Sequence, residues 1–155
     1  MMVRRLLVLV LLCMAAGCGV RGAAARAWTA QVQDASVRAD QVRARGDLAG
    51  ARGALIGLAT LSVPAGVAAD DGRAVRMDAF FRLAQLELQD SNPKAARDWA
   101  ERGLALGAHR DVFTANLHLA HGRALEALGV DLEAQASYHR ALVVTEALLG
   151  TALDQ

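Results

Sequence analysis

The residues best placed for metal chemistry are two histidines one helical turn apart. His118 and His121 occur three positions apart in a helix-forming stretch, so both imidazoles would project from one side of a helix. Two imidazoles could contribute to a zinc site, and His109 and Asp111 lie within a few turns. However, the H-E-x-x-H pattern is absent, and the sequence has no cysteine near this stretch. We predict packing histidines and no metal, with a metal or small-ligand site as the alternative.

The sequence offers no clear group for covalent catalysis or nucleotide binding. No Ser, Thr or Cys stands in the setting of a nucleophile elbow. Residues 50–57, GARGALIG, contain several glycines but lack the lysine of a phosphate-binding loop. The acidic residues are scattered and read as helix caps and solvated positions. The sequence therefore predicts a protein that is not an enzyme and has no cofactor.

The first eighteen residues, MMVRRLLVLVLLCMAAGC, have the pattern of an export signal. Two arginines precede an apolar run, 6–16, which is shorter than the roughly 20 apolar residues that cross a membrane. The pattern predicts a signal peptide, 1–17. Its end, Ala15-Ala16-Gly17-Cys18, resembles a bacterial lipoprotein signal. That resemblance implies that the Cys18 thiol is alkylated with diacylglycerol, whose acyl chains include palmitate, and that the chain is then cleaved before Cys18. An ordinary secretory signal is the alternative.

The residues around Cys18 extend this interpretation. Cys13 would leave with the signal peptide, so Cys18 would be the only thiol, and lipidation would remove a liability in an oxidising compartment. Gly19, rather than Asp, follows Cys18, and in Gram-negative lipoproteins this implies transport to the outer membrane, facing the periplasm. We expect residues 18–27 to be a lipidated tether, a short coil whose end can be helical.

Composition predicts an all-α domain over residues 28–150. Ala and Leu are abundant, only two prolines occur, and no run alternates with period two over the length of a strand. The formal net charge is +1 and no basic stripe with interleaved aromatics is present, so nucleic acid is not expected as a partner. The positions expected to face the core are Val32, Ala35, Ala39 and Val42; Leu48, Ala51, Leu55 and Leu58; Phe80, Leu83, Ala84 and Leu86; Ala96, Ala100, Gly103 and Leu104.

Local signals divide this domain into six helices with short connections. Glycine favours the left-handed residue that ends a helix, and Asp, Asn and Thr favour the cap that begins one. The expected helices cover 28–45, 47–61, 70–88, 93–106, a fifth segment after the break at 107–110, and 131–149. The expected boundary residues are Gly46 and Asp47, the loop 62–69, Asp70 and Asp71, Asn92 and Pro93, Gly107, Asp111 or Thr114, Asp131, and Gly150.

The stretch 118–144 resembles the tetratricopeptide repeat (TPR) family. Small and large residues follow one another at steps of three, four, five, four and three, at Gly122, Leu125, Gly129, Ala134, Tyr138 and Ala141. Weaker copies fall on Ala84, Glu87, Ser91, Ala96, Ala100 and Gly103, and on Ala39, Val42, Gly46, Ala51, Leu55 and Leu58. Glu87, Ser91 and Leu58 depart from the family pattern. The resemblance implies three antiparallel helix hairpins stacked as a short right-handed solenoid.

In the TPR family the first helix of each hairpin lines a concave groove. Carried onto this sequence, that implies a partner-binding groove at Arg43, Phe81, Gln85, Asn116, Leu119 and Arg123, flanked by Gln33, Ser36, Asp40, Asp78, Leu88 and Glu126. Phe81 and Leu119 would anchor a peptide, or Phe81 would be buried under the loop 62–72. Arg43 and Arg123 would pair a carboxylate, and Asn116 would hold a backbone amide.

The expected function is that of a lipid-anchored adapter or scaffold of the bacterial cell envelope. It would bind an unidentified envelope protein or peptide, as accessory lipoproteins of pilus assembly, secretion or outer-membrane assembly do. The alternative is a structural helical lipoprotein that associates with itself.

Overall fold

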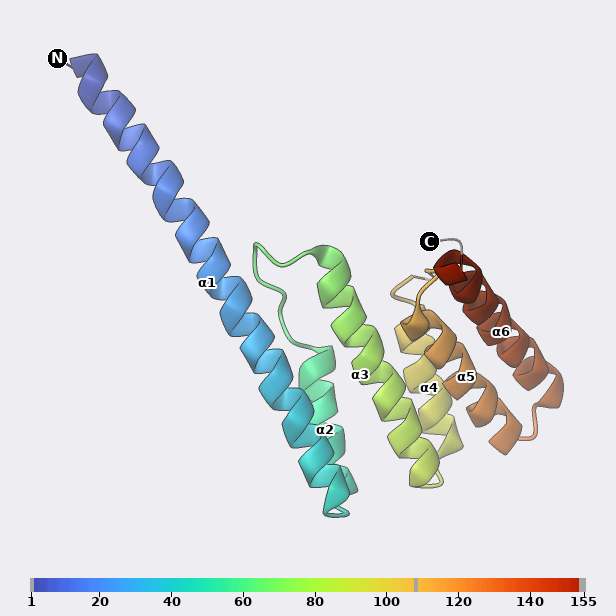
Figure 1. Ribbon diagram of the computed structural model, residues 1–155. Coiled ribbons are helices and arrows are strands. Elements are labelled where there is room, and N and C mark those ends of the chain that lie inside the picture. The colour runs from blue at the N-terminus through green and yellow to red at the C-terminus, as the bar shows by residue number, and fades with distance from the viewer. Residues whose placement is uncertain (1, 108, 154–155) are drawn as a thin grey trace.

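The fold is all-α, as composition predicts. The computed structural model describes residues 2–107 and 109–153, with side chains described from residue 22 onward. Within these residues the secondary structure is helical, without a strand, and the chain forms a row of antiparallel helices (Figure 1). The helices are α1 (Met2–Ala44), α2 (Leu48–Ala59), α3 (Ala69–Gln89), α4 (Pro93–Leu104), α5 (Val112–Ala127) and α6 (Asp131–Leu153).

The odd-numbered helices share one layer of the molecule. Each helix packs against the next along the chain, and α3 also packs against α5. An ion pair of 2.7 Å between Arg82 of α3 and Asp40 of α1 joins α1 to the same layer. The even-numbered α2 and α4 lie behind this layer in Figure 1. Side chains from three non-consecutive segments therefore come together on one face.

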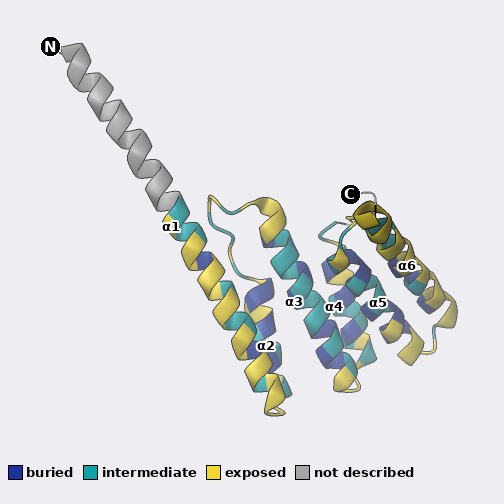
Figure 2. Cartoon of the chain, in the orientation of Figure 1, coloured by how far each residue is buried: buried dark blue, intermediate teal, exposed yellow. Residues whose placement is uncertain are grey.

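Small residues permit this close packing, and those of α1 to α4 lie where the sequence predicts. Ala39, Ala51, Leu55, Leu83 and Leu86 form one buried cluster across α1, α2 and α3. Ala84, Ala100 and Ala120 form another where α3, α4 and α5 meet. The buried residues face neighbouring helices, and exposed residues cover the outside (Figure 2). Burying apolar surface between helices stabilises the fold by roughly 25 cal/mol per Å².

Two glycines mark the tightest helix contacts. A Cβ atom on Gly122 of α5 would lie 2.6 Å from the ring of Tyr138 in α6. A Cβ atom on Gly103 of α4 would lie 2.5 Å from the side chain of Leu117 in α5. Real Cβ atoms do not approach other heavy atoms this closely, so a larger residue at either position would push the helices apart.

Three of the turns share one geometry. The second residue after the end of α1, α3 or α5 is left-handed in each case. The N–H of the following residue donates to a carbonyl five residues back, which satisfies a carbonyl at the helix end. Glycine adopts that conformation without strain, and Ser91 adopts it at some energetic cost. The residues are Gly46, Ser91 and Gly129, with φ of 82°, 57° and 75°, and the bonds are Asp47 to Val42 (3.2 Å), Asn92 to Glu87 (2.8 Å) and Val130 to Leu125 (3.0 Å).

Three predicted helix caps are confirmed. The Asp47 carboxylate accepts a hydrogen bond from the Gly50 N–H at 2.8 Å, and Asp111 accepts one from the Thr114 N–H at 2.8 Å. Asn92 caps α4 and Pro93 occupies its first turn. Each side chain satisfies a backbone N–H that has no partner within its own helix.

Other predicted boundaries are wrong. Asp70 and Asp71 do not cap α3, because Ala68 holds the cap position without a side-chain bond and both carboxylates lie in the first turn. Asp131 is likewise the first residue of α6 rather than its cap. Carboxylates in a first turn still interact favourably with the positive end of the helix dipole. Gly150 does not end α6, which continues to Leu153, because one glycine costs a helix only about 1 kcal/mol.

The end of the predicted tether before residue 28 is helical, as the sequence allows. Residues 22–27 belong to α1, consistent with the high helix propensity of their four alanines. The first helix of the domain therefore begins before residue 28. The side chains of the predicted signal peptide, 1–17, and of Cys18 lie outside the described residues.

Candidate functional site

A hollow on the layer formed by the odd-numbered helices collects polar side chains from all three of them. Its lining combines guanidinium, amide and apolar groups, and its volume is about 530 Å³. It is an open surface feature rather than an enclosed cavity. The lining residues are Arg43 from α1, Gln85, Leu88 and Gln89 from α3, and Arg123 from α5. We call this feature the odd-helix hollow.

The odd-helix hollow brings together three of the six predicted groove residues. Arg43, Gln85 and Arg123 come from helices far apart in the sequence and line the same depression. Asn116, Leu119 and Phe81 do not line it. Asn116 and Leu119 are half-buried on α5, and Asn116 makes no side-chain hydrogen bond within the described residues.

Phe81 packs against the core and does not line the odd-helix hollow. It is half-buried and packs against the cluster of Ala84, Ala100 and Ala120. Contacts within the protein thus cover part of the predicted peptide anchor. The small side chains of Ala100 and Ala120 leave room for the Phe81 ring. The sequence around Phe81 does not predict these neighbours, because they belong to later helices.

The guanidinium of Arg82 organises the charges beside the hollow, and sequence reasoning missed it. It pairs with Asp40 at 2.7 Å and Asp78 at 3.7 Å, and it also donates to the Ser36 carbonyl oxygen at 3.5 Å. Burial raises the pKa of Asp78; the Arg82 charge opposes this shift and the Asp40 charge adds to it. In the sequence, the only sign of this ion pairing is the four-residue spacing of Asp78 and Arg82, which places them on one side of a helix. Arg82 thereby pairs with two acidic side chains on this face.

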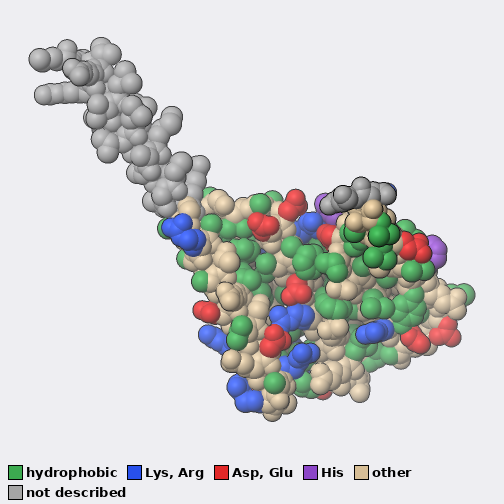
Figure 3. Space-filling model, in the orientation of Figure 1, with side chains coloured by type: hydrophobic (Ala, Val, Ile, Leu, Met, Phe, Trp, Pro, Cys, Tyr) green, Lys and Arg blue, Asp and Glu red, His purple; other side chains and the backbone are tan. Residues whose placement is uncertain are grey.

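The two arginines of the hollow have few carboxylates close enough to balance their positive charges. Arg43 is half-exposed, and its nearest carboxylate oxygen, on Asp40, is 4.0 Å away and already paired with Arg82. Arg123 is exposed and forms no ion pair within the described part of the chain. Charged side chains of both signs alternate over α1 and α3, whereas hydrophobic side chains dominate over α5 and α6 (Figure 3). Two available guanidiniums can hold a carboxylate with charge-assisted hydrogen bonds.

The two histidines lie at helix contacts, as their positions predict. The Ser137 hydroxyl donates to the His118 carbonyl oxygen at 3.1 Å and lies 2.9 Å from Nδ1 of His121. Nε2 of His121 is 3.4 Å from a Glu101 carboxylate oxygen. These are the residue types of a hydrolytic triad, but Ser137 is completely buried and its hydroxyl donates to a backbone carbonyl.

The His118 ring itself is poorly satisfied. Its Nδ1 is buried and has no hydrogen-bond partner among the described residues. Burial, followed by the positive charges of Arg140 and His121, lowers the pKa of His118 below its usual 6.5. Within the described residues, no three His, Cys, Asp or Glu side chains are grouped as a metal would require.

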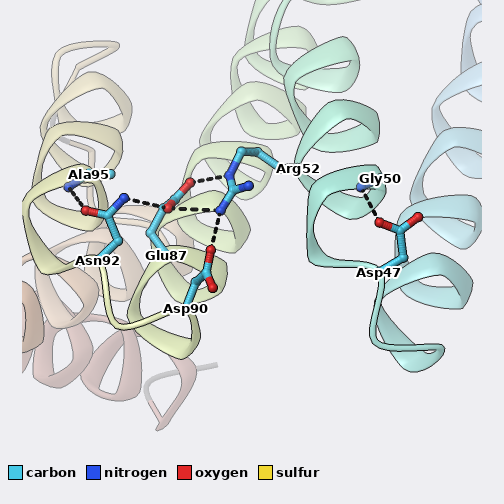
Figure 4. A network of polar contacts seen from close by, with 7 residues as sticks. All are labelled: Asp47, Gly50, Arg52, Glu87, Asp90, Asn92 and Ala95. Atoms are coloured by element: carbon cyan, nitrogen blue, oxygen red, sulfur yellow. Dashed lines mark hydrogen bonds and ion pairs between the residues drawn. The ribbon is translucent and has the colours of Figure 1, made fainter.

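A buried acidic network joins α2 to the turn between α3 and α4 (Figure 4). Glu87 is almost completely buried and receives two bonds from Arg52, at 2.6 and 3.2 Å, and one from the Asn92 side chain at 3.2 Å. Arg52 also reaches Asp90 at 2.9 Å, and these carboxylates raise the Arg52 pKa. The TPR pattern has a large apolar residue at the position of Glu87. Here the acidic side chain has a charged partner, Arg52, 35 residues away. Because every carboxylate oxygen of Glu87 is bonded, the network is structural.

Comparison with known proteins gives no relative. No protein-family model, no curated protein and no solved structure matches this chain. Among the described helices, none combines the length and the apolar character that a membrane crossing requires.

Proposed function

We propose that the chain is a short TPR-like stack that acts by binding another protein. Support comes from three equivalent turns, at Gly46, Ser91 and Gly129, which fall on one mark of the repeat and share their hydrogen bond. Further support comes from the marks for small residues. Ala39, Ala84 and Gly122 are buried at the first mark, and Ala51, Ala96 and Ala134 are buried at the fourth. Equivalent residues in equivalent roles are what a repeat architecture requires.

The function that the surface supports best is that of an adapter or scaffold that holds a peptide segment of a partner. The observation that carries it is the odd-helix hollow, where Arg43, Gln85 and Arg123 meet from three helices. Two guanidiniums beside an amide and Leu88 suit a segment that carries a carboxylate next to an apolar side chain. The binding is non-catalytic, and the partner is an envelope protein or peptide.

The proposed location is the bacterial cell envelope. The apolar run 6–16 and the small residues before Cys18 support an exported lipoprotein, anchored at Cys18 in the outer membrane and facing the periplasm. Two or more acyl chains on one residue give firm attachment, whereas a single chain binds only marginally. A role in pilus, secretion or outer-membrane assembly belongs to this proposal.

The test is photocrosslinking of the full chain in cells, with the crosslinking side chain at position 85. We expect a covalent adduct with one partner in the wild-type background and its loss in the double variant Arg43→Glu, Arg123→Glu. The matched control is Arg38→Glu, Arg110→Glu, which makes the same charge change at exposed positions outside the hollow. An adduct that survives the first double variant, or is lost in both, contradicts the proposed site.

Membrane attachment is measured by fractionating the same cells. A Cys18→Ser chain should leave the membrane fraction, and the wild-type chain should take up a labelled palmitate analogue. A Cys18→Ser chain that stays in the membrane would show that the anchor is not a lipid on this residue.

A further inference from the structure

The outer face of α6 carries the largest group of exposed apolar side chains in the described residues. Within the described chain, α6 packs against α5 through Ala134, Ser137 and Ala141, which are buried. Five large side chains project away from that contact, a number unusual for a free surface. They are Leu132, Leu142, Val143, Leu149 and Leu153, exposed by 83, 54, 49, 60 and 86%.

These side chains form one continuous stripe. At about 100° per residue, the five positions fall within one side of the helix, together with His139 and Glu146, which are also exposed. The stripe extends from Leu132 to Leu153, about 31 Å at 1.5 Å per residue. It reaches that length because α6 continues through Gly150. We call it the α6 stripe.

The α6 stripe is complementary to itself. In an antiparallel pair of helices, residues equally far from the twofold axis lie at the same height. An axis between Leu142 and Val143 sets Leu132 opposite Leu153 of the second copy, and His139 opposite Glu146. Ala136 then lies opposite Leu149. An axis at residue 144 would instead set His139 against Leu149 and Glu146 against Leu142, which leaves both polar groups against leucine.

We infer that two copies of this chain associate through antiparallel packing of their α6 stripes. A twofold interface requires one patch that fits itself, and the α6 stripe has apolar pairs at both ends and its centre, with complementary polar pairs between them. A lipid surface is a poorer fit. Helices that lie on membranes are rich in Lys and Arg on their polar side. In contrast, α6 carries Arg140 against Asp131, Glu133 and Glu146.

The first test measures the mass of the full chain in a mild detergent by light scattering over a range of concentrations. We expect a dimer that dissociates on dilution. Leu142→Glu should raise its dissociation constant at least about tenfold, because it brings two carboxylates together at the axis. The control, Val37→Glu, places the same charge at a similarly exposed apolar position on α1. Far-UV circular dichroism confirms that both variants are folded.

The second test establishes the register. His139→Glu alone opposes two carboxylates, and Glu146→Lys alone opposes a lysine to a histidine, so both should weaken the dimer. The double variant His139→Glu, Glu146→Lys should restore it, since each copy then pairs Glu with Lys. Arg43→Glu, Arg123→Glu should leave the dimer unchanged, which separates this inference from the proposed peptide site.

Other results overturn the inference. A wild-type chain that is monomeric at every concentration removes it, as does a Leu142→Glu chain that dimerises like Val37→Glu. A double charge variant that stays monomeric contradicts the antiparallel register. If a photocrosslinker at position 142 attaches to phospholipid in phosphatidylethanolamine–phosphatidylglycerol vesicles and never to a second chain, the stripe contacts the membrane instead.

Discussion

An imidazole whose buried Nδ1 lacks a hydrogen-bond partner gives a single residue an effect on the stability of the whole fold. Nδ1 of His118 has no partner among the described residues, and burial lowers the His118 pKa. The unfolded chain therefore binds a proton at this residue more readily than the folded chain. The stability that comes from a neutral His118 is fully present above pH 6.5, the ordinary value. It is lost as the pH falls through the lower pKa of the folded state.

The prediction at this scale concerns the pH dependence of unfolding. Replacing His118 with Leu should flatten the decrease in unfolding free energy below pH 6.5, because the new side chain has no proton to bind. Urea unfolding of the full chain in detergent, repeated across this pH range, measures it. His109→Gln is the control, since His109 is exposed. Parallel pH profiles for wild type and His118→Leu would contradict the assignment.

The helical elements show which features a sequence reveals. Asp47, Asn92 and Asp111 bond to N–H groups three residues away, so their roles could be predicted from neighbouring residues alone. The partner of Glu87 is 35 residues distant on another helix, and only the packing of α2 on α3 brings it near. The same limit applies to Phe81, whose neighbours Ala100 and Ala120 belong to later helices. The repeat marks predicted Arg43, Gln85 and Arg123 of the hollow, whereas the role of Arg82 beside it depends on the packing of α1 on the same layer.

The prediction for the elements concerns the contact between Arg52 and Glu87. Arg52→Ala should lower the unfolding free energy by about 3 kcal/mol, because it leaves a buried carboxylate without its charged partner. The double variant Arg52→Met, Glu87→Leu should recover most of that loss, since apolar residues of similar volume replace the pair. Chemical denaturation of the three chains measures both effects. A loss below about 1 kcal/mol for Arg52→Ala would instead be typical of an exposed ion pair.

At the scale of the whole molecule, a row of helices depends on contacts between neighbours. In the described residues the main helix contacts join neighbours along the chain, with α3 also packing against α5, and the cluster of Ala84, Ala100 and Ala120 joins α3, α4 and α5 in the middle. Stability in such an arrangement is close to a sum of the individual units and the interfaces between them. Damage to the central interface should therefore release both ends of the row, whereas damage at one end should stay local.

Ala100→Leu tests this dependence. The added carbons overfill the central cluster and should cost about 1–3 kcal/mol. Amide hydrogen exchange should then increase in α1 and α2 and also in α5 and α6, because each end loses the interface that couples it to the rest. Ala127→Leu, at an exposed position near the end of α5, should leave exchange unchanged throughout. If faster exchange in Ala100→Leu is confined to α3, α4 and α5, the two end pairs are stable by themselves and the molecule does not behave as a coupled row.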